Sequence, residues 1–322
     1  MVSTKFLGIV LLSTTILWSC KSEGDKPTKD VGEIGEVSIS VEGGNIYGSL
    51  EGDNSETVLM VIAGSGQTDR DGGSGGAAGN SLKLLGEHVV DAGYSVFRYD
   101  KRTAGESYKE FAGTAVLFDD FINDAAACVD YLKETGFNNI VVAGHSQGSL
   151  IGMKIAQAGG IAGYISIAGP ARDIDALITD QIVRQSPQFE SEVVRMFQEL
   201  KDSGKTLVKS KPLEGLFNER NQPFIVNWMS YNPAEELTKV TVPILIINGK
   251  HDVQVGTEEA VSLAEVSGTE PLIIDSMNHI FRNAPAEFYT NIATYSDLEL
   301  PINKQFISAV VNFISECEES KK

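Results

Sequence analysis

The sequence predicts an α/β fold, with a mostly parallel sheet, helices on both faces and a mostly helical insertion. Continuous apolar runs at 57–63 and 140–143 are typical of strands buried on both faces. Segments with apolar residues at helical spacing alternate with these runs. The alternation stops near residue 171 and resumes near 236, which indicates one segment inserted into a single sheet domain.

The elements follow one another in a regular order. Residues 36–40 and 46–50 alternate in polarity around Gly43-Gly44 and predict a hairpin. The other strands are expected at 94–99, 163–168, 242–248 and 271–274. Helical patterns occur at 81–92, 117–135, 150–157, 257–266 and 307–314. The predicted domain comprises residues 36–170 and 236–318.

Residues 171–235 predict a mostly helical lid. Apolar residues repeat at helical spacing at Ile174, Leu177, Ile178 and Ile182, and again at Phe189, Val193, Phe197 and Leu200. A looser stretch with aromatic residues follows and holds Phe217, Phe224, Trp228 and Tyr231. We expect these aromatic side chains to pack the lid itself rather than to touch a substrate.

The first twenty residues predict an export signal rather than part of the fold. Lys5 precedes an apolar stretch at 6–18 that is too short to span a bilayer. Leu17-Trp18-Ser19-Cys20 resembles a bacterial lipobox, which implies lipidation of Cys20. An ordinary signal peptide with an incidental cysteine is the alternative. Residues 21–35 are polar and suit a tether, so we expect an exported protein anchored by lipid at the periplasmic side or the cell surface.

The composition is ordinary for a globular protein, but the charge is not balanced. The chain has 322 residues, of which 42% are apolar and 22% charged, with a formal net charge of −18. Such a charge disfavours nucleic acid and anionic membrane surfaces as partners. Cys128 and Cys317 lie on helical patterns and are expected to be small buried residues. The sequence does not indicate an oligomeric state.

The most informative motif is Gly144-His145-Ser146-Gln147-Gly148. It lies between a predicted buried strand and a predicted helix, which is the context of a nucleophile elbow. In such a turn the serine adopts strained dihedral angles, and flanking glycines prevent clashes. Ser146 is therefore the candidate nucleophile, and a glycine turn with a solvated serine is the alternative.

A serine hydroxyl needs a base, and the base needs a carboxylate to orient it. The chain holds four histidines, and His279 alone lies in the loop after the last predicted strand, where parallel sheets place active sites. Asp252, just after the 242–248 strand, is the candidate acid, with Asp275 as the alternative. A turn aspartate that binds local backbone amides is the other interpretation of Asp252.

A tetrahedral oxyanion needs two preorganised donors. The backbone N–H of Gln147 is one candidate. The other should come from Gly64-Ser65-Gly66, where glycines allow the backbone to approach a substrate closely. Ser65 N–H is the choice and Gly66 N–H the alternative. A glycine-rich loop can also hold phosphate, but this one lacks the Lys-Ser/Thr of a nucleotide-binding loop.

Together these motifs resemble the α/β-hydrolase superfamily over residues 36–318. The stretches 63–72, 98–102, 144–148 and 278–281 are similar to exported bacterial esterase-like hydrolases that are grouped with serine aminopeptidases. The resemblance implies Ser146 as nucleophile, His279 as base and Asp252 as its partner. One departure is Lys101-Arg-Thr-Ala-Gly105, because relatives usually have glycine directly after the arginine. Another is Ala63, where many hydrolases have histidine.

We therefore expect a serine esterase that acts on a small-molecule carboxylic ester through an acyl-enzyme, without metal or organic cofactor. Two alternatives remain at this stage. One is an aminopeptidase-like serine peptidase, for which acidic lid residues such as Asp175, Asp180 and Glu190 could bind the substrate amine. The other is a non-catalytic binding protein that keeps the fold.

Overall fold

A computed structural model of the chain describes residues 35–320. The predicted export signal, the lipidation at Cys20 and nearly all of the predicted tether lie outside the described residues. Within 35–320, none of the helices combines the length and the apolar character that crossing a membrane requires.

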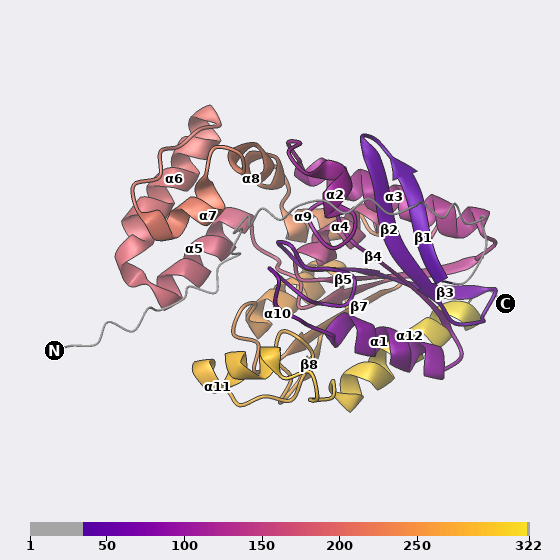
Figure 1. Cartoon of the computed structure of the whole chain (residues 1–322). Coiled ribbons are helices and arrows are strands. Elements are labelled where there is room, and N and C mark those ends of the chain that lie inside the picture. Colours follow the sequence, from indigo (N-terminus) through magenta and orange to yellow (C-terminus); the bar gives the residue numbers. More distant parts are fainter. Residues whose placement is uncertain (1–34, 321–322) are drawn as a thin grey trace.

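The core of the molecule is an eight-stranded sheet with the order β1-β2-β4-β3-β5-β6-β7-β8 (Figure 1). Strands β1 and β2 form the predicted antiparallel hairpin, and β2 is antiparallel to β4. All later neighbours are parallel. The bounds are β1 Gly35–Val41, β2 Gly44–Glu51, β3 Thr57–Ile62, β4 Ser95–Tyr99, β5 Asn139–His145, β6 Gly163–Ile167, β7 Ile244–Gly249 and β8 Leu272–Ile274. Every residue of β3, β4, β5 and β6 is buried, as their continuous apolar runs predict.

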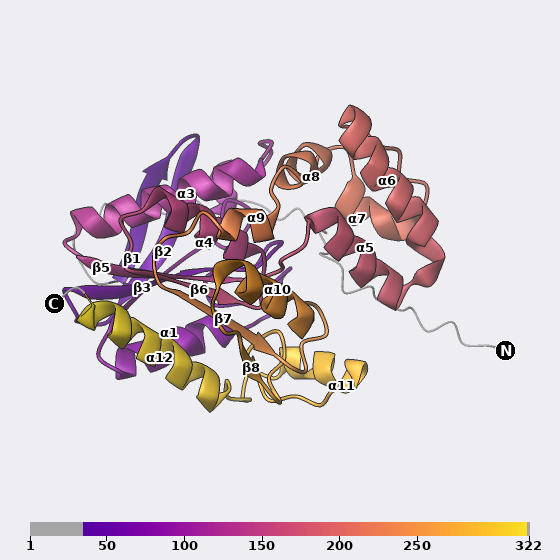
Figure 2. The same cartoon turned by 180° about the vertical axis from the view of Figure 1, so that it is seen from behind.

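Helices cover both faces of the sheet (Figure 2). Helices α3 (Phe118–Glu134), α4 (Gln147–Ala158) and α10 (Thr257–Ser267) share one hydrophobic core with one face. Helices α1 (Ser81–Asp91) and α12 (Lys304–Glu319) share a second core with the other face. Cys128 and Cys317 are buried in α3 and α12. The sheet order, the predicted hairpin and the two helical layers agree with the predicted fold class.

The helices between β6 and β7 form the inserted segment, residues 171–235, which lies beside the sheet domain (Figure 1). Its helices are α5 (Ile174–Gln185), α6 (Glu190–Ser203), α7 (Glu214–Phe217), α8 (Gln222–Trp228) and the start of α9 (Pro233–Leu237). Both spacing patterns found in the sequence form helices, α5 and α6. The two ends of the segment meet, because the N–H of Ala234 donates to the carbonyl of Ala171 at 3.1 Å.

Several element bounds differ from the sequence prediction. The final helix, α12, extends beyond the predicted 307–314 at both ends, and its start at Lys304 is set by Asn303, which accepts from the N–H groups of Gln305 and Phe306. Strand β7 begins at Ile244, two residues later than predicted, after Pro243, whose nitrogen cannot donate to a strand ladder. Short helices that no spacing pattern predicted occur at α2 (Tyr108–Phe111) and α11 (Phe288–Ala293).

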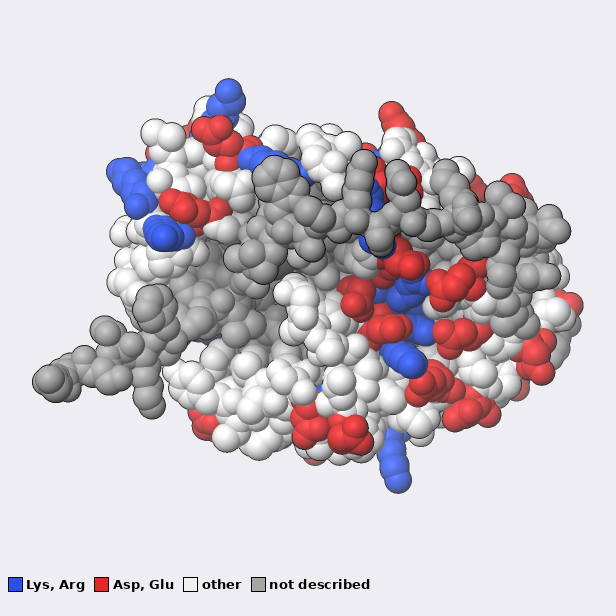
Figure 3. Space-filling view, viewed as in Figure 1, with Lys and Arg blue, Asp and Glu red and all other residues white. Residues whose placement is uncertain are grey.

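Acidic side chains are prominent on the face of the molecule shown in Figure 3, in keeping with the negative net charge. One group of basic side chains on this face lies among carboxylates. Arg70 pairs with Glu36 at 2.5 Å, Asp100 at 3.0 Å and Glu106 at 2.7 Å, and Arg98 pairs with Asp71 and with Glu51. These pairs join the loop after β3 to the hairpin and to the loop after β4.

Candidate active site

Ser146 lies in the turn between β5 and α4, as the motif predicts. Its φ of 53° and ψ of −119° are strained for a residue with a side chain. The N–H of Ser146 donates to the carbonyl of Ile167 on the neighbouring β6, at 2.9 Å. A side chain at Gly144 would run into the backbone of Gly148, and one at Gly148 into the backbone of Ile62. The two glycines are therefore required by the closeness of strand and helix.

His279 and Asp252 come together although 27 residues separate them. His279 Nδ1 donates to Asp252 Oδ2 at 2.7 Å, and the two side chains are 5% and 0% exposed. The other oxygen of Asp252 accepts from the N–H groups of Gln254 at 2.8 Å and Val255 at 2.9 Å. Both interpretations of Asp252 thus hold at once, since it binds local amides and a histidine. Because Nδ1 donates, Nε2 of neutral His279 is left as the acceptor.

Asp275, the alternative acid, lies elsewhere. It pairs with Lys250 at 3.2 Å, and its side chain is 91% exposed. An exposed pair of this kind cannot hold an imidazole in a fixed tautomer as a buried carboxylate does. His251, which precedes Asp252, is directed away from His279, because its Nδ1 donates to the carbonyl of Ala284 at 2.6 Å.

The loop that carries His279 is held by its own neighbours. Asn278 Oδ1 accepts from the N–H of Arg282 at 3.0 Å and from the N–H of Ile280 at 3.2 Å. His145 Nε2 donates to the carbonyl of His279 at 2.9 Å, and the two imidazole rings lie 4.7 Å apart. Burial and the neighbouring His279 hold the pKa of His145 well below its ordinary value. His145, the residue before Ser146, is therefore neutral, and its ring joins the nucleophile turn to the backbone of His279.

The candidate oxyanion donors lie on two adjoining turns. Gln147 is the first residue of α4, so its N–H has no partner in a preceding helical turn. Gly64 lies against the elbow, because an added Cβ there would be 3.2 Å from His145 Nδ1 and 3.3 Å from Ser146 Cβ. The carbonyl of Ser65 accepts from Thr68 Oγ1 at 2.8 Å, and among the described residues nothing accepts from the Ser65 N–H.

Lys101 lies between these two turns and is 1% exposed. Its Nζ donates to the carbonyl of Gly64 and to Gln147 Oε1, the latter at 3.0 Å, and it lies 5.0 Å from the centroid of the Phe121 ring. Burial lowers the pKa of Lys101 to about 7. In a trans peptide the N–H points opposite to the C=O. Because Lys101 holds the Gly64 carbonyl, it also sets the direction of the Ser65 N–H.

The rest of the Arg98–Arg102 stretch fixes the same loop. Asp100 accepts from the backbone N–H of Arg70 at 2.7 Å and from its side chain. The Asp100 carboxylate also lies against Gly105, whose φ is +50°, so that a Cβ there would collide with it. The tight turn after Asp100 therefore requires glycine at 105.

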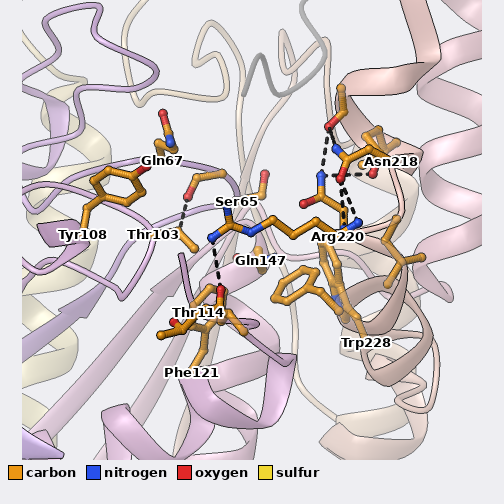
Figure 4. Close-up of a pocket in the computed structure, with 17 residues that line it drawn as sticks. Ser65, Gln67, Thr103, Tyr108, Thr114, Phe121, Gln147, Asn218, Arg220 and Trp228 are labelled. Carbon is orange, nitrogen blue, oxygen red and sulfur yellow. Dashed lines mark hydrogen bonds between the residues drawn. The ribbon is translucent and has the colours of Figure 1, made fainter. Parts of the chain in front are cut away.

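A cavity of about 300 Å³ adjoins this site (Figure 4). Ser65 and Gln147 form part of its wall, whereas neither Ser146 nor His279 does among the described residues. The opposite wall comes from the inserted segment, with Arg220, Phe224 and Trp228 among its residues. A carbonyl held by the N–H groups of Ser65 and Gln147 would therefore lie at the border between the cavity and the nucleophile.

The aromatic residues of the inserted segment serve two purposes. Phe217 packs inside the segment against Phe197, with ring centroids 5.0 Å apart. Phe224 and Trp228 line the cavity in addition to packing, whereas we expected the aromatic side chains to pack the lid rather than to touch a substrate. They reach it because α8 packs on α3, where Trp228 stacks on Phe118 at 5.4 Å.

Sequence reasoning missed Lys101, His145 and Arg220. Lys101 lies in a stretch that supported the resemblance, but a lysine after a strand gave no sign that it is buried. His145 is the variable residue of the elbow motif, and only the packing of its ring reveals a contact with His279. Arg220 carries no signal in the sequence, since its place depends on how the inserted segment folds.

Solved structures share the arrangement of most of the chain. Est1E from Butyrivibrio proteoclasticus has a TM-score of 0.55 and 16% identity, over 88% of this chain and 99% of that one. A proline iminopeptidase from Mycobacterium smegmatis has a TM-score of 0.58 and 12% identity, over 89% and 100%. At such identities the likeness defines the fold, which is that of the α/β-hydrolases.

Sequence comparison adds similarity to particular groups of hydrolases. Residues 73–221 match the family model described as Serine aminopeptidase, S33. Esterase EstD of Thermotoga maritima is 28% identical over 241 residues, which is 71% of this chain but only 57% of the length of that relative. The fold is thus that of the α/β-hydrolases, and both sequence matches are to hydrolases, one a serine aminopeptidase family and the other an esterase.

Proposed function

We propose that the protein hydrolyses carboxylic esters through an acyl-enzyme formed on Ser146. The observation that carries the proposal is the buried His279–Asp252 pair at 2.7 Å, at the strand ends that also hold the strained Ser146 turn. A histidine fixed in this tautomer by a buried carboxylate serves as a general base for a neighbouring hydroxyl.

In the proposed reaction, His279 Nε2 takes the proton of the Ser146 hydroxyl as its oxygen bonds to the ester carbonyl carbon. The carbonyl oxygen becomes an anion, which the N–H groups of Ser65 and Gln147 stabilise. The C–O bond to the alcohol breaks, and His279 gives the proton to the leaving alcohol oxygen. A water molecule then attacks the acyl-enzyme by the same steps in reverse, releasing the acid and free Ser146.

The cavity favours esters over peptides with a free N-terminus as substrates. A pocket for a substrate ammonium needs a carboxylate, and none of the described residues that line the cavity is Asp or Glu. Asp175 instead pairs with Lys201, and Asp180 with Arg172, at 2.6 and 2.5 Å. Neither of these residues nor Glu190 lines the cavity. Comparing hydrolysis of an aminoacyl arylamide with that of an aryl ester checks this preference, and a faster arylamide reaction would reverse it.

Replacing Ser146 by alanine tests the mechanism. We expect Ser146→Ala to lower kcat for a short-chain aryl ester by about 10⁴-fold or more, because no other group can form the acyl-enzyme. The measurement is initial rates together with thermal unfolding, which should be unchanged within a few degrees. A fluorophosphonate probe should label the wild type on Ser146 and leave the variant unlabelled.

Retained ester hydrolysis in a folded Ser146→Ala variant would remove Ser146 from the mechanism. Absence of both labelling and hydrolysis in the wild type would instead favour a binding protein that keeps the fold. Ser149→Ala serves as the matched control for labelling, because Ser149 lies in the first turn of α4, three residues after Ser146, and its hydroxyl contacts Tyr164 and Ser166, each at 2.8 Å.

A further inference from the structure

The cavity beside the oxyanion turns differs in charge from the rest of the chain. The sequence holds 44 acidic residues against 26 basic ones. Among the described residues that line the cavity, however, the only charged side chain is that of Arg220. Most of the remaining wall is apolar or uncharged, with Phe121, Phe224 and Trp228 as its aromatic part. A strongly acidic protein thus presents a cation, and no carboxylate, in the space next to its nucleophile.

Arg220 lies in the turn between α7 and α8, and its backbone is held in place. Its N–H donates to Asn218 Oδ1 at 3.1 Å. The side chain extends from the inserted segment across the cavity, toward the side where Ser65 and Thr103 lie in Figure 4. One nitrogen, Nη2, donates to the carbonyl of Thr114 at 3.1 Å. This contact ties the guanidinium to the sheet domain.

Within the described residues, no carboxylate neutralises the charge of Arg220. Arg70, Arg98 and Arg172 each pair with a carboxylate. No such pair involves Arg220 within residues 35–320, and its hydrogen-bond partner through Nη2 is a neutral carbonyl. A guanidinium carries five N–H donors in a planar fork that matches a carboxylate. Most of these donors are left for a ligand.

The part of the inserted segment that carries Arg220 packs against the sheet domain through specific contacts. Trp228 stacks on Phe118 of α3 at 5.4 Å with an angle of 2° between the rings. Asn227 Oδ1 accepts from the N–H of Asp119 at 2.9 Å, and the Tyr231 hydroxyl donates to Asp119 Oδ1 at 2.6 Å. Because Arg220 stands just before α8, these contacts fix the distance between its backbone and the oxyanion turns.

We propose that the preferred substrates are esters that carry a carboxylate in addition to the ester group, and that Arg220 binds this carboxylate while the aromatic wall contacts the apolar part between the two. The inference rests on the proposed esterase function. The carboxylate can belong to the acyl part, as in a monoester of a dicarboxylic acid, or to the alcohol part. Either position supplies the same ligand chemistry to the guanidinium.

Matched ester pairs test the inference. Mono-para-nitrophenyl adipate and para-nitrophenyl hexanoate have the same acyl length and differ by a carboxylate on the acyl side. Butyrate esters of 4-hydroxybenzoic acid and of its methyl ester differ by a carboxylate on the alcohol side. In at least one pair, the wild type should have the higher kcat/KM for the anionic member. In Arg220→Gln the ratio of anionic to neutral kcat/KM should fall by about 10- to 100-fold, the effect of losing one charge-assisted hydrogen-bonded contact.

Arg184→Gln is the matched control. Arg184 is an exposed arginine on α5 of the same inserted segment and does not line the cavity. This variant removes the same charge from the molecule, so an effect of net charge alone would appear in both variants. We expect the ratio to stay unchanged in Arg184→Gln and to recover in part in Arg220→Lys, which keeps the charge but loses the planar fork.

The two proposals fail in different ways. Hydrolysis of all four esters with a ratio that Arg220→Gln does not change would overturn the inference and leave the esterase function standing. If the wild type hydrolyses none of them, the inference is tested by binding. Calorimetry with Ser146→Ala and the adipate and hexanoate esters reports whether the anionic ester binds more tightly. The same measurement on the double variant Ser146→Ala/Arg220→Gln reports whether the difference is lost. Equal binding there would overturn the inference as well.

Discussion

The two walls of the cavity are built in different ways. On the sheet-domain side, the candidate oxyanion donors are backbone amides, and buried side chains such as Lys101 and Asp100 hold the loops that present them. On the side of the inserted segment, the lining groups are side chains, among them Phe224 and the exposed Arg220. In the proposed mechanism, backbone topology positions the chemistry, whereas side chains on the insertion select the ester.

This contrast has a direct kinetic consequence. A substitution that disturbs the catalytic groups or the oxyanion amides should slow all esters by the same factor, because the tetrahedral intermediate is common to them. A substitution on the inserted wall should change the rates of some esters more than others.

The largest effect is expected at Asp252. In Asp252→Asn the amide cannot hold His279 with its proton on Nδ1, so kcat should fall by about 10⁴-fold for neutral and anionic esters alike. The carbonyl oxygen of the asparagine can still accept from Gln254 and Val255, so the loop should stay folded. Initial rates with para-nitrophenyl hexanoate and mono-para-nitrophenyl adipate measure the effect. Asp275→Asn is the control, and a greater loss there than at Asp252 would reassign the acid.

An intermediate effect is expected at Lys101. Lys101→Met removes the contacts that fix the Gly64 carbonyl and the Gln147 side chain, so the Ser65 N–H loses its fixed direction. Loss of one oxyanion donor costs about 100-fold in kcat or more, and misorientation should cost up to that amount, with KM changed little. Steady-state kinetics over several acyl lengths measures it. A loss confined to KM, or to one ester, would show that Lys101 does not act through the oxyanion site.

The pH dependence of stability distinguishes the loss of the buried Lys101 charge from a general packing defect in Lys101→Met. The pKa of Lys101 is about 7 in the folded chain and near 10.4 when exposed, so between these values the unfolded state binds the extra proton. Burial of the charged Lys101 side chain therefore lowers the free energy of unfolding by its full amount below pH 7. This cost declines as the pH rises toward 10. The free energy of unfolding of the wild type, minus that of Lys101→Met, should increase by up to about 1.4 kcal/mol per pH unit in this window. Urea unfolding at pH 7 and pH 9 measures it, and Lys83→Met, an exposed lysine, should show no such change.

The smallest effect is expected at Phe224. Phe224→Ala widens the inserted wall and should raise the ratio of kcat/KM for octanoate over butyrate esters by about tenfold, the size typical of an apolar pocket that gains or loses a methylene or two. Phe189→Ala provides the control, because Phe189 lies in the same segment but does not line the cavity. If Phe224→Ala instead slowed all esters equally, the division between the two walls would be wrong.

The same contrast explains what the sequence could predict. Ser146, Asp252 and His279 each follow a strand of the sheet, and parallel strands end at one edge, so the contact between His279 and Asp252 could be inferred from order alone, with Ser146 expected at the same edge. Ser65 and Gln147 could be chosen because glycine patterns mark tight turns. Lys101 could not be chosen, because burial of its Nζ depends on how the loops after β3 and β4 pack. The direction of the Arg220 side chain depends on the docking of α8 on α3 through aromatic contacts, which have no sequence spacing of their own.

The hydrogen bond from Ala234 to Ala171 bears on how such a protein can evolve. Because the inserted segment leaves and rejoins the sheet domain at one point, its length and content can change without moving the strands on either side. Selectivity can therefore diversify by exchange of a whole module, while the hydrolytic apparatus is inherited intact.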